Sequence, residues 1–86
     1  MRIDKFLKIS RIIKRRSVAA DACDSGRIEI NGSITKPSKN IKIGDIVTVT
    51  FGDNLTTFKV LSIDEHQTKN SATEMYEIIS VNGENQ

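Results

Sequence analysis

Apolar residues near the start of the chain recur at helical spacing, and the charged residues between them fall on the opposite side of the helical wheel. The apolar positions are Ile3, Phe6, Leu7, Ile9 and Ile13; the charged ones are Lys5, Lys8 and Arg15, with Arg11 at the margin. The pattern predicts an amphipathic helix over residues 3–13. Asp4, in its first turn, suits the positive end of the helix dipole.

A second helix is predicted after the basic run at 14–16. Ser17 is a favourable N-cap, the helix should extend to about Ser25, and Gly26 should follow as a left-handed C-cap. The residues expected to face inward are small, which lets two helices joined by a short turn approach closely. They are Val18, Ala19, Ala22 and Cys23.

Strand-like alternation begins at residues 27–30. Asn31-Gly32 follows and favours a type I′ hairpin turn, because both residues tolerate positive φ. The predicted later elements are a return strand at 33–35, a basic loop at 36–44, a hairpin of 46–51 and 56–63 joined by 52–54, a polar loop at 64–73, a last strand at 75–81 and a frayed tail at 82–86.

These elements predict an α+β fold, with two N-terminal helices packed on a small, mostly antiparallel, twisted sheet of four or five strands. Eighty-six residues support one small core, so we expect a single domain over residues 1–86. Its central motif should occupy about residues 1–50, and its C-terminal strands should lie within 56–81.

Charge is distributed unevenly along the chain. Residues 1–42 hold eleven Lys or Arg and four acids, a balance of +7, whereas residues 43–86 hold two bases and seven acids, a balance of −5. The overall +2 therefore hides a dipolar molecule. A concentrated basic end is the electrostatic footprint of a protein that lies along a polyanion.

The sequence offers no catalytic constellation, so we expect neither an enzyme nor a bound cofactor or metal. His66 stands alone in a polar loop and is interpreted as a surface residue, and Cys23 as a buried small hydrophobe. A lone cysteine fits a reducing compartment, and there is no secretory signal or membrane span, so we expect a cytosolic protein with no membrane partner.

Two observations favour structured RNA over DNA as the polyanion. The segment 18–24, which would be the reading helix of a helix-turn-helix, is small and acidic and has no Asn, Gln or Arg to meet base edges. The cations lie instead on the first helix and the corner after it, where they can contact a phosphate backbone. The alternative is that the basic stripe is only a solvated helix face.

Several short motifs resemble the S-four RNA-binding domain, named for a small-subunit ribosomal protein. They are Arg2-Ile3-Asp4-Lys5-Phe6-Leu7, Arg16-Ser17-x-Ala19, Gly26-Arg27-Ile28-x-Ile30-Asn31-Gly32, Pro37-Ser38 and Gly44-Asp45. Within that superfamily the run 8–16 is most similar to the RqcP (YabO-like) family. The related heat-shock-protein-fifteen family typically has Trp in place of Phe6 and a long basic C-terminal extension, whereas the C-terminal half here is acidic.

The resemblance implies a factor of bacterial ribosome-associated quality control. Such a factor binds large ribosomal subunits obstructed by peptidyl-tRNA, contacts 23S rRNA and tRNA, and supports C-terminal alanine tailing by an RqcH-type NFACT protein. It should act as a monomer. The alternatives are a heat-shock-protein-fifteen-like factor that recycles obstructed subunits, and a non-enzymatic adaptor that binds protein through its acidic sheet face.

The residue set expected to bind RNA combines the basic face with the positions that match the family motifs. It comprises Arg2, Asp4, Lys5, Lys8, Arg11, Lys14, Arg15, Arg16, Arg27, Asn31, Lys36 and Lys39.

Overall fold

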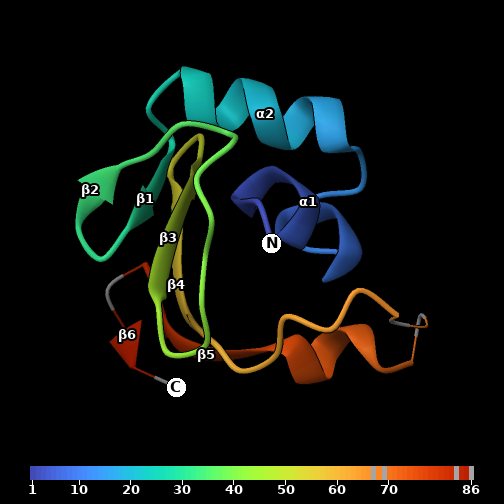
Figure 1. Cartoon of the computed structure of the whole chain (residues 1–86). Helices are drawn as coiled ribbons and strands as arrows, with labels where there is room; N and C mark the ends of the chain where they lie inside the picture. Colours follow the sequence, from blue (N-terminus) through green and yellow to red (C-terminus); the bar gives the residue numbers. More distant parts are fainter. Residues whose placement is uncertain (67, 69, 83, 86) are drawn as a thin grey trace.

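The computed structural model describes residues 1–66, 68, 70–82 and 84–85 (Figure 1). Its elements are α1 (Ile3–Ile9), α2 (Arg16–Asp24), β1 (Ile28–Ile30), β2 (Ser33–Ile34), β3 (Ile46–Phe51), β4 (Asn54–Val60), the 3-10 helix η1 (Ala72–Met75), β5 (Tyr76–Val81) and β6 (Glu84–Asn85). The described strands form one antiparallel sheet in the order β2-β1-β3-β4-β5-β6. The predicted α+β fold, with two helices on an antiparallel sheet, is confirmed.

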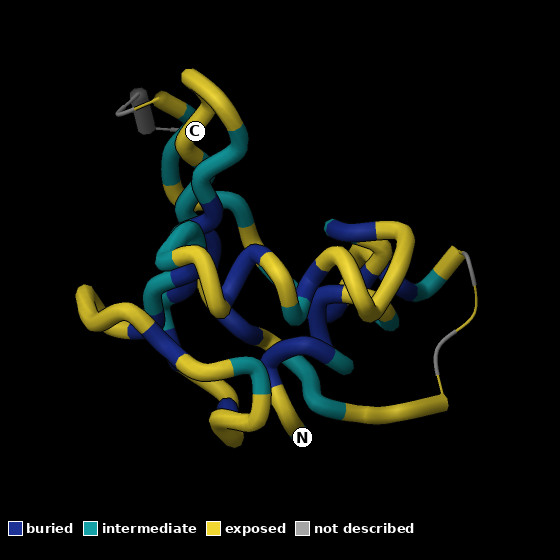
Figure 2. Tube along the Cα trace, turned by 90° about the horizontal axis from the view of Figure 1, so that it is seen from above, coloured by how far each residue is buried: buried dark blue, intermediate teal, exposed yellow. Residues whose placement is uncertain are grey.

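The core lies between the two helices and one face of the sheet (Figures 1 and 2). Phe6 of α1 stacks on Phe58 of β4 with ring centroids 6.0 Å apart, and Tyr76 meets Phe58 edge-on at 5.5 Å. Ala19, Ala22 and Cys23 of α2 are buried, as their small size predicted, and this lets α2 lie close against α1. Val18 was expected to face inward, but it is 40% exposed.

The first helix is shorter than predicted. It ends at Ile9 because Arg11 adopts a left-handed conformation, with φ of 63°, and its backbone N–H returns to the Lys8 carbonyl at 3.1 Å. The N–H of Ile13 then donates to the Leu7 carbonyl at 3.0 Å, so Ile13 enters the core from a turn rather than from a helix. The apolar spacing was real, but it did not require one continuous helix.

The second helix also begins differently. Arg15 holds the extended N-cap conformation and α2 starts at Arg16, so the predicted Ser17 N-cap is wrong. No side chain caps this end. At the other end, Gly26 has φ of +76°, as predicted for a left-handed residue after the helix.

The hairpin turn is as predicted, with φ of 52° at Asn31 and 85° at Gly32, and Ile30 paired with Ser33. The boundaries of the later elements differ. β4 begins at Asn54 and ends at Val60, three residues before the predicted end, because the N–H groups of Leu61 and Ser62 turn to the Met75 carbonyl. The supposed polar loop contains the start of η1, whose Ala72 and Met75 are buried.

The tail was expected to fray at 82–86, yet Glu84–Asn85 forms β6 against β5, which brings the described strands to six; residues 83 and 86 lie outside the described residues. Among the described residues, no helix reaches the length and apolarity that a bilayer crossing needs.

Candidate nucleic-acid interface

The N-terminus of α1 is capped by backbone from a distant loop. The N–H of Ile3 donates to the Lys39 carbonyl at 2.8 Å, and the N–H of Asp4 donates to the Pro37 carbonyl at 3.3 Å. Ile41 returns the connection by donating its N–H to the Met1 carbonyl at 2.9 Å. These bonds satisfy helix N–H groups that have no partner inside the helix. They also fix the basic loop beside the basic helix.

The buried carboxylate of Asp4 binds two arginines, Arg2 and Arg16. Its carboxylate is 4% exposed; Oδ2 accepts from Arg2 Nη2 at 3.1 Å, and Oδ1 accepts from Arg16 Nη2 at 3.4 Å. Oδ1 also accepts the Lys5 backbone N–H at 2.7 Å. Arg2 and Arg16 are 48% and 47% exposed, so their guanidinium groups remain open to solvent while one carboxylate aligns them.

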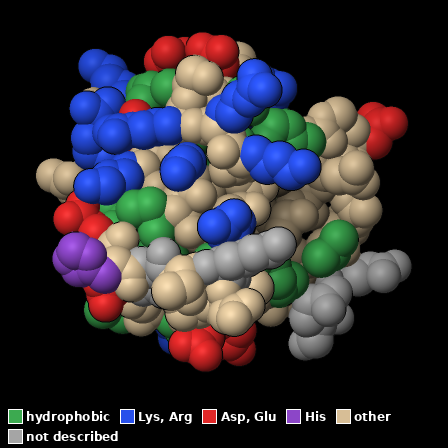
Figure 3. Space-filling model, turned by 90° about the vertical axis from the view of Figure 1, so that its right-hand side faces the viewer, with side chains coloured by type: hydrophobic (Ala, Val, Ile, Leu, Met, Phe, Trp, Pro, Cys, Tyr) green, Lys and Arg blue, Asp and Glu red, His purple; other side chains and the backbone are tan. Residues whose placement is uncertain are grey.

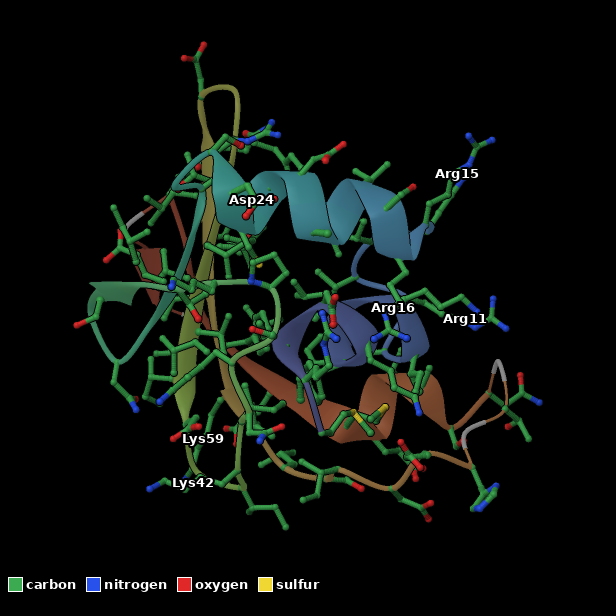
Figure 4. The ribbon with its side chains drawn as sticks, turned by 45° about the horizontal axis from the view of Figure 1, so that its top comes forward. Arg11, Arg15, Arg16, Asp24, Lys42 and Lys59 are labelled. Carbon is green, nitrogen blue, oxygen red and sulfur yellow. The ribbon has the colours of Figure 1, made fainter. Side chains whose placement is uncertain are left out.

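The turn after α1 supplies the next cations. Arg11 and Arg15 project outward on the side where α1 ends and α2 begins, whereas Arg16 lies further in, over α1 (Figure 4). Lys8, Arg11 and Lys14 line an open hollow of about 600 Å³, together with Ile9 and Glu65. Blue side chains gather over this side of the space-filling view, with acidic side chains at the edges (Figure 3).

Glu65 reaches this hollow from the C-terminal half and pairs with Lys5. The hydrogen bond from Lys5 and the positive charge of that ammonium group lower the pKa of the Glu65 carboxyl. An acid from the negative half of the chain therefore lies within the basic face.

A second open groove, of about 620 Å³, lies between the β1–β2 hairpin and the loop that follows it. Its lining includes Lys36, Lys39 and Lys42. The one acid in this lining, Asp45, is buried and accepts hydrogen bonds from Asn31 Nδ2 at 3.2 Å and from the Lys42 N–H at 2.9 Å. Figure 4 shows Lys42 well away from Arg11 and Arg15, so this groove extends the positive surface to another side.

Two predicted RNA-binding residues hold the fold instead of pointing freely to solvent. Asn31 donates to Asp45 and accepts the Ile46 N–H at 2.9 Å, which fixes the hairpin turn to β3. Arg27 places its guanidinium 5.7 Å from the Phe51 ring centroid and donates from Nε to Ser25 Oγ at 3.1 Å. Asp4, unlike these two residues, is buried, which suits it to orienting arginines. RNA contact by these three side chains stays a prediction.

Cys23 is 2% exposed, as expected for a small core residue. Burial first, and then the nearby negative charges of Asp4 and Asp24, raise the pKa of its thiol from 9.0 to about 11. His66 is exposed. Within the described part of the chain, no group of three His, Cys, Asp or Glu side chains is placed to hold a metal ion.

The sequence interpretation missed Glu65 and the structural role of Asp45. A hydrogen bond across 60 residues leaves no local sequence pattern, so Glu65 had no detectable signal. Asp45 did have one, because Gly44-Asp45 was among the motifs that carried the family resemblance.

Two helices, a tight β-hairpin and a basic face anchored by a buried acid define a class of small α+β domains. The chain belongs to the S4 domain family, which it matches over residues 1–47. The resemblance noted in the sequence is thereby confirmed.

Similarity to individual proteins covers almost the whole chain. A Streptococcus pneumoniae protein named RQC P-site tRNA stabilizing factor is 50% identical over 80 residues, which are 93% of this chain and 91% of that protein. A Listeria monocytogenes protein of the same name is 48% identical, over 92% of this chain and 86% of that protein. Vibrio cholerae Heat Shock Protein 15, solved as a trimer, superposes with a TM-score of 0.83 at 30% identity, over 91% of this chain and 80% of that one.

Proposed function

We propose that this chain is a non-catalytic RNA-binding factor of bacterial ribosome-associated quality control. It binds large ribosomal subunits obstructed by peptidyl-tRNA and stabilises the tRNA in the P site. Support comes from similarity, over more than nine-tenths of this chain, to proteins named RQC P-site tRNA stabilizing factor. The observation that bears most directly on mechanism is the pair of half-exposed arginines held by Asp4.

The mechanism is electrostatic docking. Guanidinium groups that are already aligned lose little side-chain freedom when they meet phosphate, so the anchored pair binds a backbone more favourably than two free side chains would. The basic hollow and the lysine groove add contacts around this pair. The protein thus positions tRNA against 23S rRNA by gripping backbone phosphates.

The finer parts of the proposal follow the family resemblance. The whole chain acts as one RNA-binding domain and as a monomer in the cytoplasm. By holding the tRNA, it supports the C-terminal alanine tailing of stalled chains by an RqcH-type NFACT protein on the same particle.

A salt titration tests the proposal. Wild-type protein, Arg16→Ala and Lys59→Ala are each titrated onto obstructed large subunits at several salt concentrations. If about five cations meet phosphates, the log–log slope for the wild type is near −3.5 to −4.5, since each contact contributes about −0.7 to −0.9.

Arg16→Ala should weaken binding by about 1.5–3 kcal/mol, because it removes a charge-assisted contact. The variant should remain folded, since Asp4 keeps its bonds to Arg2 and to the Lys5 N–H. Lys59 is an exposed cation on β4 and serves as the matched control, with an unchanged slope expected. A flat salt dependence, or binding that survives ribonuclease, would favour the protein-binding adaptor instead.

A further inference from the structure

Glu65 is the one acid in the lining of the hollow formed by Lys8, Arg11 and Lys14. It arrives from a segment 60 residues away in sequence and pairs with Lys5 of α1. Its carboxylate therefore pairs with a cation on the surface to which the proposed function assigns RNA phosphates. The S4 domain match ends at residue 47, so this acid lies outside the part of the chain that defines the family.

The segment that presents Glu65 is fixed at its base. The N–H groups of Leu61 and Ser62 both donate to the carbonyl of Met75, at 2.8 and 3.2 Å, and Met75 is fully buried. Further along, the Asp64 N–H donates to Ser62 Oγ at 3.2 Å, and the His66 N–H donates to an Asp64 carboxylate oxygen at 2.9 Å. These bonds shape the segment on both sides of Glu65, and the ion pair with Lys5 connects it to α1.

The exposure of the pair allows exchange with a ligand. The Lys5 side chain is 35% exposed and that of Glu65 is 54% exposed, so a solvent-borne phosphate can approach both. An exposed ion pair is weak, and a phosphate in the hollow would also interact with Lys8, Arg11 and Lys14. The phosphate can therefore displace the carboxylate from Lys5, but it must overcome the repulsion of Glu65 to do so.

We propose that Glu65 is an acidic competitor built into the RNA interface, which occupies Lys5 until an RNA phosphate replaces it and so limits the affinity for polyanions. This inference rests on the proposed function, because it assumes that RNA occupies the basic face. The ligand class is the phosphodiester backbone of RNA. No change in the fold is required, only an exchange of partners at the Lys5 ammonium group.

The test compares Glu65→Gln with Asp53→Asn. Both remove one negative charge from an exposed acid of the C-terminal half with little change in size, but Asp53 lies in the β3–β4 turn and outside the hollow. Each protein is titrated with a short RNA duplex and with obstructed large subunits at several salt concentrations. Glu65→Gln should bind the duplex about two- to five-fold more tightly, the range that an exposed ion pair supports. Its salt slope should steepen by about 0.7–0.9, one phosphate contact.

A double-mutant cycle with Lys5→Ala tests whether Glu65 limits RNA affinity through its pairing with Lys5. If competition acts through Lys5, the gain from Glu65→Gln shrinks in the Lys5→Ala background. Equal gains from Glu65→Gln and Asp53→Asn would show a diffuse effect of net charge and overturn the proposal, as would no gain from either. The proposed function is tested separately by wild type against Arg16→Ala. If the wild type shows no salt-dependent RNA binding, both fail; if it binds normally while Glu65→Gln is silent, only the competitor role fails.

Discussion

Asp4→Asn separates positioning of the arginines from simple electrostatics. Asp4 is an acid within a basic face, so a model based on net charge predicts tighter RNA binding when its charge is removed. The geometry predicts the opposite. The buried carboxylate accepts from both Arg2 and Arg16, and the variant would lose the charge that aligns them. We therefore expect weaker RNA binding although the face gains a unit of positive charge.

The size of the effect follows from the contacts. Asn can still accept the Lys5 N–H through its amide oxygen, but its amide nitrogen cannot accept from Arg2. A hydrogen bond to a charged group contributes about 1.5–3 kcal/mol. Because the guanidinium is half-exposed and can be resolvated, we expect a loss of about 1–2 kcal/mol in unfolding free energy. For a domain of this size that lowers Tm by roughly 4–16 °C.

The assay measures binding and folding on the same samples. Thermal unfolding followed by circular dichroism gives Tm, and titration of obstructed large subunits below the unfolding range gives affinity, with an expected loss of about three- to ten-fold, equivalent to roughly 0.7–1.4 kcal/mol. Glu65→Gln is the matched comparison, because it removes one acid from the same face but should raise affinity. Tighter binding by both variants would refute the positioning role of Asp4.

Three further outcomes are expected. Arg11→Gly should raise the unfolding free energy by about 1 kcal/mol in thermal melts, because glycine accepts φ of 63° without strain, yet it should reduce the RNA salt slope by about 0.7–0.9. Gly32→Val should lower the unfolding free energy by about 1–2 kcal/mol, since φ of +85° is strained for a β-branched residue; an unchanged Tm would contradict the turn assignment. Cys23 should react with a thiol reagent at pH 8 only after unfolding, because a pKa raised from 9.0 to about 11 leaves the thiol protonated well above neutral pH; rapid labelling of the native protein would contradict its burial.

The sequence predicted best where local chemistry decides the structure. Asn31 and Gly32 specify a turn because both tolerate positive φ, and the register of Ile30 with Ser33 follows directly from it. The small residues Ala19, Ala22 and Cys23 likewise predicted that α2 packs closely against α1. Both signals depend on neighbours in the chain, which a single sequence contains in full.

The ends of the helices were harder to predict: distant residues cap the start of α1, and an unfavourable local conformation at Arg11 ends it. Pro37 and Lys39 supply the carbonyls that cap α1, and neither position signals this role in the sequence. Arg11 is a poor choice for a left-handed residue by local preference, so the spacing of Ile13 suggested a longer helix. The Lys5–Glu65 ion pair could not be predicted either, because only the folded chain brings those two side chains together.

The backbone cap on α1 ties the stability of the fold to the alignment of its basic face. The same loop carbonyls that hold Ile3 and Asp4 place Lys39 beside the start of α1, and Asp4 in turn holds Arg2 and Arg16. A change that loosens this connection would therefore disturb both the helix start and the anchored arginines. The cations beyond Ile9 stand on a separate turn and at the start of α2, so their charges can be altered with less effect on the core. Two kinds of mutation should accordingly weaken RNA binding. One kind removes a cation that contacts phosphate; the other leaves every cation in place but removes the Asp4 carboxylate that aligns Arg2 and Arg16.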